Sequence, residues 1–229
     1  MFIGMDRLQD LADTIRSTAG GAVSLGIIPA FSHTIVPEAI RDFCLGRQDV
    51  RIMTSIRNTP AIIDAVQMRQ FDLGIVGRSP PYDGVDVLFH DSVPYVCLVP
   101  SGHRLAWDGD QLDLEELAET ESFVTFGGVY PDEMLDIDSD LSARLNRNSR
   151  LFAANMPIAA SLVRATGSLA IVDPYTARIE EKLGGVVSRQ IRQNLTYHIA
   201  IIGPGPGILP LAASEFADLL IARFEDSIG

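Results

Sequence analysis

The apolar positions of this chain form short continuous runs that alternate with segments of helical periodicity. The first segment is helical, because Leu8, Leu11 and Ile15 recur at the helical spacing and Gly20 and Gly21 end it. After it, apolar runs typical of buried strands alternate with amphipathic helices. The predicted strands are 22–28, 50–56, 73–77, 85–89, 95–99, 122–126, 150–154, 169–172 and 195–202, and the predicted helices are 35–45, 59–70, 132–146, 156–166, 175–183 and 209–224. This alternation predicts an α/β protein with largely parallel sheets covered by helices.

One unit of this pattern occurs twice. Residues 58–76 (NTPAIIDAVQMRQFDLGIV) and 155–172 (NMPIAASLVRATGSLAIV) each begin with Asn, have Pro two residues later and end in Leu-x-Ile-Val. Asn is a favoured helix N-cap, and Pro in the first turn loses no needed hydrogen bond. The repetition therefore predicts two similar lobes, 20–98 with 200–229 as lobe I and 99–199 as lobe II. The strands at 95–99 and 195–202 are expected to cross between them as a hinge.

Candidate binding residues follow from the expected sheets. Open α/β sheets bind ligands beyond the carboxyl ends of their strands, where helix N-termini present free N–H groups. Here this rule selects the turns at 30–34, 58–59, 125–128, 155–156 and 172–175, which would line two facing walls of a cleft. Helix capping without any ligand is the alternative for each turn. His33, in the first turn, could donate to an acidic ligand or be a solvated turn residue.

No motif in the chain demands catalysis or a metal. The run at 203–207 (GPGPG) has prolines where a phosphate loop must supply N–H groups. Residues 136–147 begin like an EF-hand loop but have Leu141 and Arg147 where Gly and Glu are needed. We therefore expect no metal and no cofactor, although the many acidic residues could contain an acid–base pair.

Composition and charge narrow the choice of partners. The 229 residues are 47% hydrophobic and 21% charged, as in a globular protein, and the formal net charge of −12 repels phosphate backbones. Cys44 and Cys97 both stand among apolar residues, which favours buried free thiols in a reducing cytoplasm over a disulfide. Without a signal sequence or an apolar run of membrane length, the chain is expected to be cytoplasmic.

From about residue 21 to 224 the chain resembles the effector-binding region of LysR-type transcriptional regulators. GAVSLGIIPAFSHTIVPEAIRDF resembles the family's first strand, ligand turn and helix, and DVRIMTSIRNTPAIIDAVQMRQFDLGIVG resembles its next strand, helix and strand. DSVPYVCLVPSGHRLA resembles the crossover into the second lobe, and GSLAIVDPYTA the strand and turn near that lobe's end. The DPYTA turn is most similar to the branch that responds to amino acids and opines.

The resemblance implies two Rossmann-like lobes with a hinge and an interlobe cleft, as in type 2 periplasmic binding proteins. It implies a homodimer, often within a tetramer, and a small amino-acid-like or carboxylate effector. DNA would be bound only through a winged helix-turn-helix domain that is absent here, and 1–19 would be the remnant of the linker helix. The implied ligand contacts are Ser32, His33, Asn58, Thr59, Thr125, Phe126, Asn155 and Asp173, the last of which could meet a ligand amine.

These observations favour a sensor that is not an enzyme. A ligand that touches both lobes would stabilise one interlobe angle over another, and in the intact regulator that angle would reposition the DNA-binding arms. A stand-alone solute-binding protein of the same fold is the first alternative. An enzyme built on a two-lobed scaffold is the second.

Overall fold

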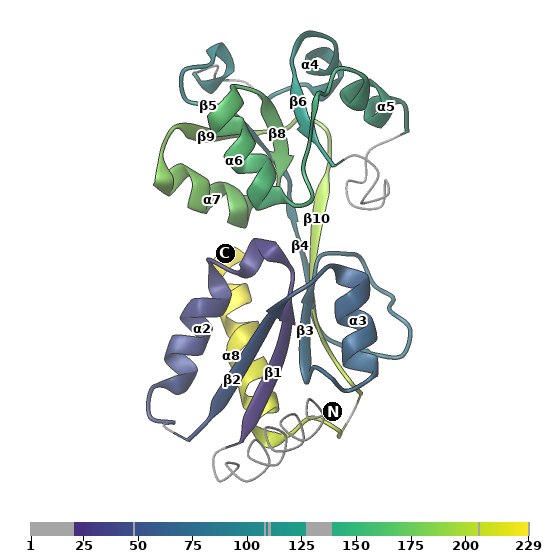
Figure 1. Cartoon of the computed structure of the whole chain (residues 1–229), viewed down its shortest axis with the longest axis vertical. Coiled ribbons are helices and arrows are strands. Elements are labelled where there is room, and N and C mark those ends of the chain that lie inside the picture. Colours follow the sequence, from purple (N-terminus) through teal and green to yellow (C-terminus); the bar gives the residue numbers. More distant parts are fainter. Residues whose placement is uncertain are drawn as a thin grey trace, which may run out of the picture.

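The computed structural model describes residues 21–47, 49–107, 109, 111–126, 139–205 and 207–228. These residues form two lobes, each built on a five-stranded sheet, as Figure 1 shows. The two-lobed α/β fold predicted from the sequence is confirmed. The expected helix and linker remnant before residue 20, and the first half of the helix expected at 132–146, lie outside the described residues.

Lobe I contains the first, second, third, fourth and last strands. Its sheet has the order β2-β1-β3-β10-β4, with β1 parallel to β2 and β3, and β10 antiparallel to both β3 and β4. The sheet is therefore mixed, because β10 returns from lobe II in the opposite direction. The elements are β1 (Ala22–Ile27), η1 (Pro29–Phe31), α2 (Ile35–Cys44), β2 (Arg51–Ile56), α3 (Thr59–Gln67), β3 (Leu73–Val76), β4 (Asp86–Pro94), β10 (Thr196–Gly203) and α8 (Leu211–Ile228).

Lobe II has a sheet of the same size, with the order β7-β6-β8-β5-β9. The strands β6, β7 and β8 are parallel, whereas β5 is antiparallel to β8 and β9. The sequence did not predict β9 or α4. The elements are β5 (Val96–Pro100), η2 (Arg104–Ala106), α4 (Leu114–Thr120), β6 (Phe123–Thr125), α5 (Ser139–Arg147), β7 (Leu151–Phe152), α6 (Met156–Thr166), β8 (Leu169–Val172), α7 (Pro174–Leu183) and β9 (Val186–Gln190).

The chain passes between the lobes twice, at two residues that lie next to each other in space. Tyr95 follows β4 and Leu195 precedes β10, and the backbone N–H of Tyr95 donates to the carbonyl of Leu195 at 3.0 Å. Strands β4 and β10 pair with each other up to this point. The two crossings thus lie side by side. The lobe boundaries expected from the sequence, at 98/99 and 199/200, lie a few residues after the crossings, inside β5 and β10.

The close approach of α3 to the lobe I sheet depends on two glycines. A Cβ added to Gly74 would lie 2.5 Å from Cγ2 of Ile62, and one added to Gly26 would lie 2.5 Å from a ring carbon of Phe71. Both distances are far below van der Waals contact. A larger residue at Gly74 would push Ile62 of α3 away from the sheet, and one at Gly26 would displace the ring of Phe71, which follows α3.

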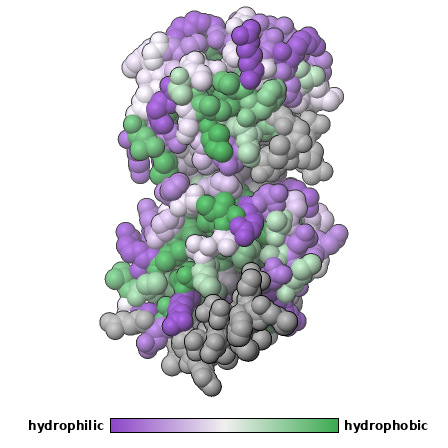
Figure 2. Space-filling view, in the orientation of Figure 1, coloured by the Kyte–Doolittle hydropathy of each residue, from purple (hydrophilic) through white to green (hydrophobic). Residues whose placement is uncertain are grey.

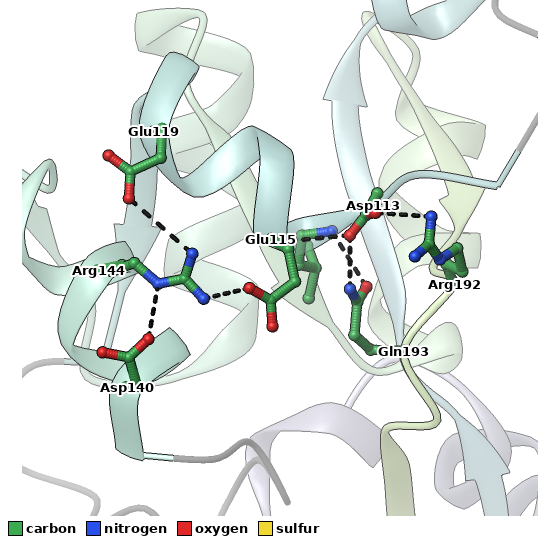
Figure 3. Close-up of polar contacts among 8 residues, drawn as sticks. Asp113, Glu115, Glu119, Asp140, Arg144, Arg192 and Gln193 are labelled. Atoms are coloured by element: carbon green, nitrogen blue, oxygen red, sulfur yellow. Dashed lines mark hydrogen bonds and ion pairs between the residues drawn. The ribbon is translucent and has the colours of Figure 1, made fainter.

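A cluster of side chains joins the second crossing to lobe II, as Figure 3 shows. Asp113 caps α4 by accepting from the N–H of Glu115 at 3.0 Å, and it also accepts from Gln193 Nε2 at 2.7 Å. Gln193 Oε1 in turn accepts from the N–H of Leu114 at 3.0 Å. The hydrogen bond from Gln193 lowers the pKa of the Asp113 carboxyl. The segment before Leu195 is thereby held against the start of α4.

A second group of charges connects α4 to α5. Arg144 of α5 pairs with Glu115 and, at 4.0 Å, with Glu119 of α4, and it reaches Asp140 one turn earlier at 3.1 Å (Figure 3). The pairs with Glu115 and Glu119 hold α5 beside α4, whereas the pair with Asp140 lies within α5 itself. Such exposed pairs contribute less to stability than apolar burial does.

The two cysteines differ in their environments. Cys97 of β5 is fully buried, and burial raises the pKa of its thiol to about 12. Cys44 is exposed at the end of α2, where the preceding Phe43 faces the core. Both thiols are free. The expectation of a buried thiol is confirmed for Cys97 and wrong for Cys44, because the helix turns Cys44 away from the sheet.

None of the helices in the described part of the chain combines the length and the apolar character needed to cross a bilayer.

Candidate functional site

The carboxyl ends of the parallel strands in both lobes point toward the junction between the lobes. In Figure 1, β1 rises toward the second lobe and β8 descends toward the first, and the space-filling view in Figure 2 narrows where the lobes meet. The turn η1, directly after β1, contacts both α6 and α7 of lobe II. The structure therefore brings the turns expected from the sequence to facing edges.

In lobe I three turns are bound together by hydrogen bonds. The N–H of Ile28 donates to the carbonyl of Ile75 at 3.2 Å, and the N–H of Arg57 donates to that of Ile27 at 3.0 Å. The hydroxyl of Thr59 accepts from the N–H of Gly77 at 3.3 Å. These bonds place η1, the start of α3 and the end of β3 side by side.

The other expected residues of lobe I lie on the same edge. Asn58 caps α3, since its Oδ1 accepts from the N–H of Ala61 at 3.0 Å. The Ser32 hydroxyl donates to the carbonyl of Pro29 at 2.6 Å and closes the η1 turn, whereas His33 is exposed beside it. Asn58 and Ser32 thus already have a structural role, and both Asn58 and His33 are exposed to solvent on this wall.

In lobe II the described parts of the three expected turns also meet, and residues 127 and 128 of the turn expected at 125–128 lie outside the described residues. Asn155 caps α6 as Asn58 caps α3, with Oδ1 accepting from the N–H of Ile158 at 3.0 Å. The N–H of Asp173 donates to Sδ of Met156 at 3.1 Å, and the N–H of Ala153 donates to the carbonyl of Thr125 at 2.8 Å. The repeated unit recognised in the sequence is confirmed, because both copies form a capped helix followed by a fully buried strand.

Asp173 is fully buried at the start of α7. Its Oδ1 accepts from the N–H of Thr176 at 2.8 Å, and its Oδ2 accepts from the Thr176 hydroxyl at 2.6 Å. Burial raises the pKa of this carboxyl, and the bonds from Thr176 act in the opposite direction. Both oxygens are directed at Thr176, so in this structure the side chain serves as a helix cap.

Thr125 differs from the other wall residues. Its Oγ1 is buried, and within the described part of the chain it has no hydrogen-bond partner. The next residue, Phe126, is buried as well. A buried hydroxyl without a partner costs about 1–3 kcal/mol, so this atom is suited to receive a polar group from a ligand.

An aromatic cluster between the lobes was not predicted from the sequence. Phe31 of lobe I contacts Tyr175 of lobe II edge to face, with ring centroids 5.1 Å apart, and contacts Phe224 at the same distance. Tyr197 lies 6.4 Å from Phe31 and 5.3 Å from Tyr95. The available signal was that Tyr95 and Tyr197 stand in the two strands expected to cross between lobes.

The tyrosines of this cluster have pKa values above the ordinary value of a tyrosine. Burial raises the pKa of Tyr95, Tyr175 and Tyr197, and the charge of Asp173 raises each of them further. The Tyr175 hydroxyl lies 3.4 Å from the Ser227 hydroxyl of α8, which adds a polar contact across the lobes. The cluster therefore fixes the relative position of η1, α7 and α8.

Within the described ranges, no three His, Cys, Asp or Glu side chains are placed to hold a metal ion.

Comparison with known proteins agrees with this architecture. The family model described as the LysR substrate binding domain matches residues 16–225. The regulatory protein NocR of Agrobacterium tumefaciens (strain T37) is 26% identical over 223 residues, which are 96% of this chain and 72% of NocR. The octopine catabolism/uptake operon regulatory protein OccR of Rhizobium meliloti is 26% identical over 188 residues, covering 79% of this chain and 59% of OccR.

Solved structures show the same fold. The effector-binding domain of QuiR, in complex with shikimate, superimposes with a TM-score of 0.71 and 19% identity, covering 92% of this chain and all of that domain. The regulatory domain of CcmR from Synechocystis PCC6803, in complex with 2-PG, gives a TM-score of 0.70 at 16% identity over 88% of this chain and 96% of that one.

Proposed function

Because the chain belongs to the family of LysR substrate-binding domains, we propose that it senses a small polar effector between its two lobes and passes the signal to a DNA-binding domain of a transcriptional regulator. The observation that carries the proposal is the buried Thr125 hydroxyl of β6, which lacks a partner among the described residues and lies on a strand packed against α6, the helix that also contacts η1 of lobe I. A ligand that bonds it and also touches lobe I favours one interlobe angle. The proposed site is Ser32, His33, Asn58, Thr59, Thr125, Phe126, Asn155 and Asp173.

The proposed effector is an amino-acid-like or carboxylate compound, and opines are the first class to try. The similarity to NocR and OccR supports this choice, as does the DPYTA turn. Helix N-termini at Asn58 and Asn155 favour negative charge on the ligand. In the intact regulator the domain acts in the cytoplasm as a homodimer, often within a tetramer, and does not act as an enzyme.

The edge of the lobe I sheet offers a surface for self-association. Strand β2 is an edge strand of its sheet, and its Met53 and Ile56 side chains are more than half exposed. Exposed apolar groups on an edge strand favour pairing with another chain. We therefore expect β2 to lie in the homodimer interface.

A thermal-shift screen with octopine, free amino acids and small carboxylates tests the proposed effector class. A compound present at about a hundred times its dissociation constant is expected to add about 2.7 kcal/mol to the free energy of unfolding. A flat response across the whole panel would contradict the effector class. Turnover of any compound in the panel would contradict the assignment as a sensor.

Thr125→Val is expected to separate ligand binding from folding. Valine replaces the unpaired hydroxyl with a methyl of the same shape, so the unliganded protein should keep its stability or gain up to about 1 kcal/mol. The affinity for the effector found in the screen should fall about tenfold, because one hydrogen bond is lost. Urea unfolding and isothermal titration calorimetry measure the two effects.

The matched control is Thr166→Val, because the Thr166 hydroxyl donates to the carbonyl of Leu162 at 2.7 Å at the far end of α6. This variant should leave the affinity unchanged. A loss of stability in unliganded Thr125→Val together with unchanged affinity would mean that the hydroxyl has a structural partner, and the proposed role of Thr125 would be wrong.

A further inference from the structure

A cavity lies between the lobes, on the side of the crossover strands. It has a volume of about 410 Å³, and none of the eight proposed effector residues lines it. Lobe I contributes Val93 at the end of β4 and Ser227 at the end of α8, and lobe II contributes Pro174 and Arg178 of α7. In Figure 1 the end of α8, marked C, lies beneath α7. A molecule in this cavity would touch both lobes at once.

The aromatic cluster stands between this cavity and the η1 turn of the proposed effector site. Tyr175 lines the cavity, and its ring also contacts Phe31 of η1 at 5.1 Å. Tyr95 lines the cavity too, and its ring contacts Tyr197 at 5.3 Å. The buried rings therefore lie between the two sites, and no residue of the proposed effector site lines the cavity.

The lining of the cavity has one charge and a mostly apolar surface. Arg178 is the only formally charged side chain among the lining residues, and it makes no ion pair within the described ranges. By contrast, Arg164 and Arg192 of the same lobe each pair with a carboxylate, at 2.5 and 2.7 Å. Guanidinium groups bind carboxylates strongly and in two-pronged geometry.

We propose that this cavity is a second ligand site, which binds a small carboxylate with an apolar body. The carboxylate pairs with Arg178 at the rim, and the apolar body lies against Tyr95, Val93 and Pro174. Because such a ligand bridges α7 and the end of α8, it stabilises the interlobe angle at which these helices meet. The proposal of this site does not rest on the proposed effector function. If the two sites are coupled, each ligand changes the affinity of the other by the same factor.

Phenylacetate is a suitable probe, and phenylacetamide is its uncharged counterpart. Titration calorimetry should show saturable binding of phenylacetate and binding of phenylacetamide that is about tenfold weaker or absent. Arg178→Gln should weaken phenylacetate binding by a similar factor, and Ser227→Trp, which fills the cavity, should abolish it. Arg178 is exposed, so the Gln variant should keep its melting temperature.

The matched control is Arg150→Gln, an exposed arginine that does not line the cavity. It should bind phenylacetate as the unsubstituted chain does. Equal binding of phenylacetate and phenylacetamide, or no saturable binding at all, would overturn the proposal. So would a loss of affinity in Arg150→Gln equal to that in Arg178→Gln.

Thr125→Val distinguishes the two sites. Phenylacetate binding should be unchanged in this variant. If Thr125→Val weakens phenylacetate binding and Arg178→Gln does not, the probe occupies the effector site and the second site is refuted. If the effector screen is silent while phenylacetate still binds through Arg178, the second site stands and only the proposed effector function is contradicted.

Discussion

Phe31→Ala is expected to lower the free energy of unfolding by about 3–5 kcal/mol, the largest effect of any substitution considered for this chain. The Phe31 side chain is fully buried, and its ring contacts Tyr175, Phe224 and Tyr197. Alanine would leave a cavity between the lobes that the surrounding rings cannot fill without moving. The rings of Tyr175, Phe224 and Tyr197 would also lose the apolar contact that they now make with Phe31.

Urea unfolding followed by circular dichroism measures this loss. The control is Phe152→Ala in β7, because that ring is 57% exposed, and its removal should cost less than about 1 kcal/mol. Equal losses in the two variants would mean that the interlobe cluster contributes little to stability. A loss confined to Phe31→Ala supports the cluster as the main contact between the lobes.

Asp173→Ala is expected to cost about 2–4 kcal/mol, because α7 loses its N-cap and two donors of Thr176 are left buried without a partner. The carboxylate accepts from both the N–H and the hydroxyl of Thr176, and the residue is fully buried. The same urea titration measures the change. A loss below that of a half-buried cap such as Asp113→Ala would contradict the structural role of Asp173.

Asp173→Asn tests the charge separately from the cap. Burial raises the pKa of Asp173 in the folded protein, so its ionised form is disfavoured by folding. The contribution of this group to stability is therefore greatest below its unfolded pKa of about 3.9 and falls as the pH rises through the folded pKa. Asparagine stays neutral and can still pair with Thr176.

The stability of the Asn variant relative to the unsubstituted chain should therefore rise between about pH 4 and pH 7. Urea titrations at the two pH values give this difference, and using the difference cancels the titration of all other groups. If the Asn variant instead loses relative stability as the pH rises, the hydrogen bonds from Thr176 outweigh burial, and the direction assigned to the pKa is wrong.

Local sequence signals predicted most of the fold. The two Asn-x-Pro units gave capped helices, and the Leu-x-Ile-Val runs gave fully buried central strands, because both depend on neighbours in the sequence. The missed elements depend on distant residues. Strand β9 is an edge strand that, among the described residues, pairs with β5 alone, so it needs no continuous apolar run. Helix α4 is short, and its start is held by Gln193.

The site could be predicted only in part for the same reason. Carboxyl ends of strands and helix caps can be located from local sequence, and the structure places these turns on facing edges. The contact between Phe31 and Tyr175 joins residues of different lobes, and no local pattern marks it. Nor could the sequence distinguish Asp173, whose oxygens are both engaged by Thr176, from Thr125, whose hydroxyl has no partner in the described ranges.

The most direct test of the two-lobed effector site is titration calorimetry with the strongest compound from the thermal-shift screen. Asn58→Ala in lobe I and Asn155→Ala in lobe II should each weaken binding by about tenfold, since each removes a residue at one wall. Asp113→Ala is the control, because it also removes an N-cap, but at α4 and outside the site. Binding should be weaker in both wall variants and unchanged in the control. Unchanged affinity in both wall variants would contradict a ligand site between the two lobes.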